Sequence, residues 1–152
     1  MSSPTENSFE NTAVEVLTVP ATKTATVTSS ACDTHGYDSV GFYVIYGTSG
    51  DTLSTGLKWT GKLQNCTTEN GNYSDCSNDD VESDVTGQTN EFALIDASGE
   101  DGKRYGISYK GSNRWVKVVI TPTGTHTYGT PIAIIAVKKL PRTVSTEDKA
   151  NP

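Results

Sequence analysis

Residues 104–121 consist of a segment in which apolar and polar residues alternate, a Gly-Ser-Asn turn and a second, largely apolar segment, and this pattern predicts two strands joined by a short turn. In the first strand the alternation gathers Tyr105, Ile107 and Tyr109 on one face and polar residues on the other. A period of two residues is the period of a β-strand. The second strand, residues 115–121, is apolar on both faces. It is therefore expected to be a central strand, or one whose outer face meets another chain.

The rest of the chain shows short segments of the same kind at regular spacing. Further strands are predicted at residues 13–19, 22–28, 40–46, 57–64, 92–96 and 131–137. Pro20 is expected to interrupt the first pair, and a turn is expected at 122–124. Residues 98–102 predict a hairpin turn with Gly102 in the left-handed conformation. About eight or nine short strands without a helical period predict an all-β fold, an antiparallel β-sandwich.

Polar segments flank and interrupt this single domain, which is expected to span residues 13–142. Residues 1–12 form a polar N-terminal arm and residues 143–152 a polar C-terminal tail, and both are expected to gain order on docking to another chain. Residues 65–84 read as a long acidic loop rich in Asn and Ser. We expect this loop to face solvent, because dense like charge is costly to desolvate.

Composition narrows the classes of function. The chain has 152 residues, a net charge of −6, a pI near 4.8 and 34% hydrophobic residues. An acidic protein does not attract nucleic acid through its overall field, so no nucleic-acid partner is expected. No apolar run is long enough to cross a membrane, and the N-terminus lacks the features of a secretory signal. Synthesis in a cytoplasm and no membrane partner are therefore expected.

Basic residues lie away from the acidic loop, and several accompany an aromatic residue on the second strand of the 104–121 unit. Trp115 shares a face with Lys117 and Val119 by alternation, so we expect an exposed anchor for a partner rather than a core residue. A purely solubilising role for the cations is the alternative. The candidate interface residues are Arg114, Trp115, Lys117, Lys138, Lys139 and Arg142.

No group of residues indicates catalysis, so the chain is not expected to be an enzyme, and no cofactor or metal ligand set is predicted. His35 and His126 lie in predicted turns without nearby residues that could join them as metal ligands. A zinc site built from Cys66, Cys76 and a distant histidine matches no common spacing, and the acidic loop lacks the spacing of a calcium loop. Three cysteines without a signal peptide argue against a disulfide framework, and a bridge between Cys66 and Cys76 is left open.

Several segments, taken in order, are similar to one group of viral proteins. They are GYDSVGFYVIYG, KWTGKLQ and, most specifically, YKGSNRWVKVVITPTGT, followed by an apolar strand that ends in LPR. Over most of residues 21–142 the chain resembles small virion proteins of tailed bacteriophages that are encoded near the major capsid gene. These include capsid decoration, or cement, proteins. The acidic insertion is less typical of them.

The resemblance implies a small β-sandwich that sits on the outer surface of an assembled phage capsid. The jelly roll is one possible topology for this sandwich. Its implied partners are the major capsid protein and further copies of itself, as a dimer or trimer. It would clamp neighbouring capsid subunits, which stabilises the assembled state by mass action. The alternative is a tail- or fibre-associated sandwich that binds a carbohydrate or a host receptor. A concave aromatic patch that includes Trp115 and Tyr43 would distinguish it.

Overall fold

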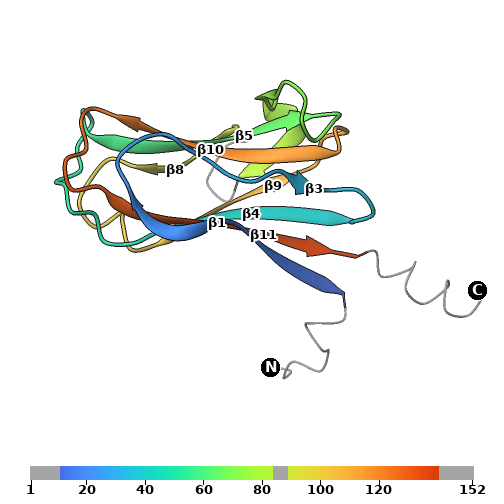
Figure 1. Cartoon of the computed structure of the whole chain (residues 1–152), viewed down its shortest axis with the longest axis horizontal. Coiled ribbons are helices and arrows are strands. Elements are labelled where there is room, and N and C mark those ends of the chain that lie inside the picture. Colours follow the sequence, from blue (N-terminus) through green and yellow to red (C-terminus); the bar gives the residue numbers. More distant parts are fainter. Residues whose placement is uncertain (1–10, 84–88, 141–152) are drawn as a thin grey trace, which may run out of the picture.

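The chain folds into two antiparallel β-sheets that pack face to face, which confirms the predicted β-sandwich (Figure 1). The computed structural model describes residues 11–83 and 89–140. The predicted arms, and Arg142 with them, therefore lie almost entirely outside the described residues. Both ends of the described chain lie at the same end of the sandwich, where Thr12 is the register partner of Lys139.

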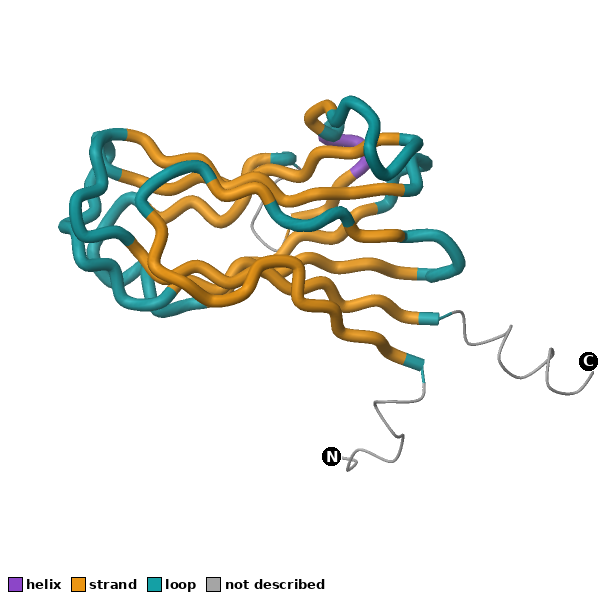
Figure 2. Tube along the Cα trace, viewed as in Figure 1, coloured by secondary structure: helices purple, strands orange, loops and turns teal. Residues whose placement is uncertain are grey.

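Each sheet combines strands from distant parts of the chain. The first sheet has the order β1 (Thr12–Lys23), β11 (Thr130–Lys139), β4 (Ser39–Tyr46), β9 (Arg104–Tyr109) and β7 (Val81–Ser83). The second sheet has the order β2 (Val27–Thr28), β10 (Trp115–Thr123), β5 (Lys58–Cys66) and β6 (Ser74–Asp75), with β3 (Cys32–Asp33) beside β10 and β8 (Glu91–Ile95) beside β5. A single 3₁₀ turn among the described residues, η1 (Asn78–Asp80), precedes β7 (Figure 2).

Strand pairing follows one rule, in which the first half of the chain pairs with the second half in reverse order. β1 pairs with β11, β2 and β3 with β10, β4 with β9, and β5 with β8. The resulting ribbon rolls up, so that β11 also pairs with β4 and β10 with β5. This is the strand order of a jelly roll. β6, η1 and β7 are an addition between β5 and β8.

Alternating side chains fill the space between the two sheets. Every second residue of β4, β5 and β10 is buried, as the period of two requires. Full burial of one large apolar side chain contributes about 1.5–3 kcal/mol. β10 lies between β5 on one side and β2 and β3 on the other, which confirms it as a central strand. The largest fully buried side chains include Trp59, Tyr46, Phe42, Leu63, Ile95 and Ile120.

Two prolines that were expected to end strands do not do so. β1 continues through Pro20 to Lys23, because β1 is an edge strand and Pro20 falls within a register shift, between Thr18 and Ala21, in its pairing with β11. A proline is tolerated there since an edge strand has a side where no ladder hydrogen bond is needed. β10 likewise continues through Pro122, at a point where β2 no longer pairs with it.

The prediction that residues 98–102 form a hairpin turn between paired strands is wrong. β8 belongs to the second sheet and β9 to the first, so the segment crosses between the sheets instead of joining neighbouring strands. Gly102 has the predicted left-handed conformation, with φ of 67°, and Gly99 shares it with φ of 86°. Both glycines make the crossing tight, since other residues rarely adopt this conformation.

Residues 65–83, the described part of the stretch predicted as one acidic loop (residues 65–84), contain more regular structure than expected. β5 runs on to Cys66, β6 pairs with it, and β7 joins the first sheet beside β9. Val81 is completely buried, so this segment contributes to the core. Its acidic side chains lie on the surface, and Asp75 pairs with Lys62 of β5 at 3.4 Å.

One buried side chain completes the second sheet where β5 changes partner from β8 to β6. The Asn90 side chain accepts a hydrogen bond from Leu63 N at 2.9 Å and donates to Leu63 O at 2.9 Å. It also donates to Cys76 O at 3.1 Å. These are the bonds that a neighbouring strand would make, so the amide group takes the place of backbone in the ladder.

We predict that Asn90→Ala lowers the free energy of unfolding by about 2–3 kcal/mol, because it leaves buried backbone groups of Leu63 and Cys76 without partners. Chemical denaturation of the purified protein measures this. Asn113→Ala, in the exposed turn before β10, is the matched control and should change stability by less than about 0.5 kcal/mol. Equal effects of the two changes would contradict the role assigned to Asn90.

Candidate docking surfaces and a buried polar network

The first candidate surface is the start of β10, on the outer face of the second sheet. Alternation places Trp115, Lys117 and Val119 outward and partly exposed, while the residues between them are buried. Asp33 of β3 and Cys66 of β5 are the register partners of Trp115 on its two sides. The predicted grouping of these outward side chains on one face is therefore present in the structure.

The cationic side chains at this surface, Arg114 and Lys117, contact neighbouring acidic or aromatic side chains. Arg114 Nε and Nη2 each donate to an Asp33 carboxylate oxygen at 2.8 Å, and the guanidinium lies 5.3 Å from the centre of the Trp115 ring. This hydrogen bonding lowers the pKa of Asp33 to about 2. Lys117 Nζ lies 4.3 Å from the centre of the Tyr73 ring. The surface thus presents a fixed array of aromatic rings and cations, a composition that is common at interface hot spots.

Lys138 differs from the other proposed interface cations, because it is buried. Its side chain falls on the inward side of β11, with 7% of the residue exposed. Its Nζ pairs with Glu15 at 2.7 Å and donates to Asp33 O at 3.2 Å. Burial alone would lower the pKa of Lys138, but the hydrogen bond to Glu15 and the electrostatic attraction of Cys32, Glu15 and Tyr37 together outweigh it, so the pKa is raised. Lys138 therefore ties β11 to β1 and β3, whereas Lys139 is exposed.

A second surface, which the sequence-based reasoning did not single out, is the outer face of the first sheet. Two rows of residues cross it from β1 through β11 and β4 to β9. They are Val16, Ile135, Tyr43 and Gly106, and Val14, Val137, Gly41 and Ser108. Ile45 follows Tyr43 on the same face of β4 and is 41% exposed. We call the set Val14, Val16, Tyr43, Ile45, Ile135 and Val137 the apolar face.

The signal for this surface was present in the sequence. Residues 40–46 and 131–137 are apolar at odd and even positions alike. One face of each strand was bound to fill the core, so the other had to be either covered or exposed. Which of the two applied depended on what lies over the sheet, and no described segment covers it.

A shallow groove of about 240 Å³ opens on the same outer face. Gly41 and Gly106 leave room at its floor, and the Tyr43 ring borders it. The Arg104 guanidinium lies 5.5 Å from the centre of the Tyr43 ring, and Glu82 of β7 lies on the opposite side. The groove offers one aromatic ring and both signs of charge.

Tyr43 and Trp115 do not share a patch. Tyr43 lies on the outer face of the first sheet and Trp115 on the outer face of the second, so the core separates them. The aromatic patch that would have distinguished the carbohydrate- or receptor-binding alternative is therefore not formed by these residues. The sequence predicts that Tyr43 and Trp115 each lie in a strand, but it does not predict which sheet each strand joins.

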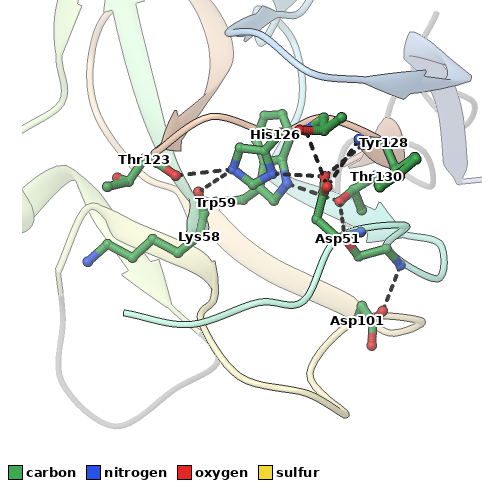
Figure 3. A network of polar contacts seen from close by, with 11 residues as sticks. Asp51, Lys58, Trp59, Asp101, Thr123, His126, Tyr128 and Thr130 are labelled. Carbon is green, nitrogen blue, oxygen red and sulfur yellow. Dashed lines mark hydrogen bonds and ion pairs between the residues drawn. The ribbon is translucent and has the colours of Figure 1, made fainter. Parts of the chain in front are cut away.

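A buried polar network lies at the end of the sandwich opposite the chain ends (Figure 3). The Asp51 carboxylate accepts three backbone N–H bonds, at 3.2, 3.0 and 2.8 Å, from Thr127, Tyr128 and Gly129. Trp59 Nε1 donates to Thr130 Oγ1 at 3.1 Å. The network fastens two long connections, the one after β4 and the one before β11, to the core.

His126 belongs to this network and has polar partners that its position in a predicted turn did not indicate. Its side chain is buried against Trp59, with ring centres 4.6 Å apart. Nε2 lies 3.3 Å from Lys58 O and 3.2 Å from Thr123 O, and Nδ1 lies 3.7 Å from Asp51 Oδ2. Since both carbonyls are acceptors, Nε2 carries a proton. The enclosed ring has no surface through which it could meet a substrate, and we assign it a structural role.

The three cysteines are free thiols. Ladder pairing places Cys66 opposite Trp115 on the outer side of the second sheet, while Cys76 is buried. Burial raises the pKa of the Cys76 thiol to about 12. Residues 11–83 and 89–140 contain no group of three or more His, Cys, Asp or Glu side chains placed to hold a metal ion. Within the same ranges no helix is long and apolar enough to cross a membrane.

No protein-family model matches the chain, and a search of curated proteins finds none with significant sequence similarity. The arguments on function therefore begin from the jelly-roll sandwich and its two candidate surfaces.

We predict that truncation of Trp59 impairs the stability of the fold, whereas truncation of Trp115 impairs binding to a partner. Trp59→Ala should lower the free energy of unfolding by about 3–5 kcal/mol, because it empties the core and removes a bond to Thr130. Trp115→Ala should leave the melting temperature close to that of the wild type and weaken contact with a partner instead. Thermal melting of the free proteins separates these effects. A large loss of stability in Trp115→Ala would mean that this ring supports the fold.

Stability should also depend on the Asp51 carboxylate at low pH. Backbone hydrogen bonds, the one from Tyr128 first, lower the pKa of Asp51 below its usual value. A lowered pKa in the folded state stabilises the protein above about pH 4, and this stabilisation is lost as the pH falls further. Asp51→Asn should lower the melting temperature at pH 7, and its difference from the wild type should shrink below about pH 4. Asp79→Asn, at an exposed position, should show no such convergence.

Proposed function

We propose that this protein is a structural component of a phage virion, one that decorates the outer surface of the capsid and stabilises it by bridging major capsid protein subunits. The observation that carries the proposal is the apolar face of the first sheet. Exposed valines and isoleucines there form rows across three strands, and contiguous apolar surface of this kind commonly marks a site of protein contact. The similarity of the sequence segments to decoration proteins agrees with this use.

Two further features support a docking protein rather than an enzyme. The polar groups at the far end of the sandwich, with Asp51 and His126 among them, are engaged in holding loops. The described chain begins and ends at the same end of the first sheet, so the predicted polar arms attach there together. Such arms are expected to gain order on docking to another chain.

The mechanism proposed is mass action. A protein that binds the assembled lattice and not the separate subunits raises the free energy needed to take the lattice apart. Apolar area supplies the affinity, and Arg104 and Lys139, which border the groove on this face, select acidic partner surfaces. No cofactor takes part in this scheme, and the protein acts at the outer surface of the virion after synthesis in the host cytoplasm.

Ile45→Glu tests the apolar face. Ile45 is the register partner of Arg104, so the new carboxylate gains a cross-strand ion pair and the fold should be kept. Docking would bury this charge, and we expect binding to purified capsid shells to fall by more than about tenfold, or 1.4 kcal/mol. Co-sedimentation of the protein with shells measures it.

The matched control is Leu94→Glu, on β8 of the other sheet. Leu94 is 37% exposed, close to the 41% of Ile45, but lies away from the apolar face. This control should bind shells like the wild type. Absence of wild-type binding to shells would reject the decoration role, whereas equal losses in both variants would reject the assigned face.

Binding of a carbohydrate, as part of a tail or fibre, is the second candidate. The groove beside Tyr43 supports it, because an aromatic ring flanked by charged and hydroxyl side chains is suited to a sugar. Trp115 plays no part in this version. Saturation-transfer NMR with host surface glycans would reveal binding, and Tyr43→Ala should abolish it.

A further inference from the structure

The first half of β1, from Thr12 to Val16, is an open sheet edge. Among the described strands only β11 pairs with β1. Features that commonly protect an edge are confined to the second half of the strand. There the register shifts twice after Val16, Pro20 interrupts the row of donors, and Ser30 N donates to Leu17 O at 3.0 Å.

The open half carries apolar side chains and no unpaired charge among the residues that the structure describes. Val14 is 64% exposed and Val16 is 59% exposed. Glu15, the one charged residue in this half, is paired with Lys138 at 2.7 Å. The opposite edge of the same sheet, β7, has three residues and carries Glu82 on its surface. The sheet thus has one guarded edge and one that is suited to pairing.

We propose that a second copy of this chain covers the edge, with the two β1 strands pairing antiparallel about a two-fold axis at Val14. A two-fold axis brings the same patch of each molecule together, so an antiparallel edge is complementary to itself. In this register Val14 meets Val14 of the second copy, Val16 meets Thr12, and Glu15 meets Ala13.

Neighbouring registers are less favourable for reasons visible in the strand. An axis at Glu15 would place two carboxylates opposite each other, which is destabilising. An axis at Val16 would bring the register shift after Val16 into the new ladder. An axis at Ala13 would move Val16 beyond the described start of the partner strand. Only the axis at Val14 places both valines in an uninterrupted ladder.

The N-terminal arm favours a second copy over an unrelated partner. In the proposed register Asn11 of one chain lies opposite Leu17 of the other. The described part of each copy would therefore start beside the second half of the partner's β1, where Val19 is 74% exposed. Ten further residues, with Phe9 as their one aromatic residue, precede it in the sequence. A second copy thus brings a further length of chain to the part of the edge that the new ladder leaves unpaired, which an unrelated partner would not do.

Such a dimer would join two five-stranded sheets into one continuous sheet. The rows of the apolar face would then run from one copy into the other across the axis. The inference concerns the free protein and does not depend on the proposed capsid role. Dimerisation is measured without shells and shell binding with Ile45→Glu, so either proposal can fail without the other.

Cysteine cross-linking tests the register. In a Cys66→Ser background, Val14→Cys places two thiols on the axis, where paired Cα atoms lie about 4.5–5.5 Å apart, within the range for a disulfide. Mild oxidation should give a covalent dimer. Val19→Cys is the matched control. It is more exposed, but its two copies would lie about 33 Å apart at roughly 3.3 Å per residue. Equal cross-linking of both variants would indicate random collision and overturn the proposal.

Sedimentation of the untreated protein tests the dimer itself. The wild type should sediment as a concentration-dependent dimer. Val14→Lys should weaken dimerisation at least about tenfold, because two like charges would meet on the axis. Its melting temperature at low protein concentration should be unchanged, since Val14 is exposed. Leu94→Lys, on the second sheet, should dimerise normally. A wild type that stays monomeric at every concentration would overturn the proposal, as would equal weakening by the two lysines.

Discussion

Insertion of the last strand between two early ones is the constraint on which the rest of this structure depends. β11 pairs with β1 on one side and with β4 on the other, so the first sheet is incomplete until residues 130–139 are in place. Contacts between residues so distant in sequence require the closure of long loops before they contribute stability, which slows folding. Until then β1 and β4 each expose an unpaired edge. The apolar face, whose rows run from β1 through β11 to β4, exists only in the completed sheet.

The two ends of the sandwich differ in what they contain. At one end, Asp51 and His126 hold the connection after β4 and the connection before β11 against Trp59. The side chains of both residues are almost fully buried there. At the other end lie β3, the start of β10, and the paired ends of β1 and β11. A jelly roll as such has no function, and function depends on the surfaces that it presents. Here the candidate surfaces lie on the sheets and at the end that carries both termini.

Particular residues show which features of the structure could be predicted from the sequence and which could not. Alternation is clear along β5, and apolar runs mark β4 and β10, so these strands and the burial of Trp59 were predictable. Pairing between strands was not, because alternation carries no information on which strand lies beside which. This is why a patch shared by Tyr43 and Trp115 was a possible distinguishing feature of the alternative function, although the two residues lie on opposite sheets. The burial of Lys138 was not predictable for a related reason, since its partner Glu15 is distant in sequence and becomes a neighbour only through β-pairing.

His126 shows a different limit. A histidine in a Gly- and Thr-rich connection is expected to be exposed, and only the closure of that connection over Trp59 buries it. The signal that could have indicated this is Asp51, an acidic residue in a second connection, but nothing local links the two. Asn90 is similar, because a polar residue beside a strand is usually read as part of a turn. Its role as a substitute for backbone depends on the change of partner along β5.

The adjacency of the two chain ends has a consequence for the connectivity of the fold. Leu140 N donates to Asn11 O at 3.0 Å, so the described chain almost closes on itself. A short linker between these residues would turn the domain into a ring with little change in its contacts. The ring could then be opened at an exposed connection such as the one between β3 and β4. In such a permuted chain β11 and β1 would be consecutive in sequence. The pairing that now joins the first and last described strands would then become a local hairpin.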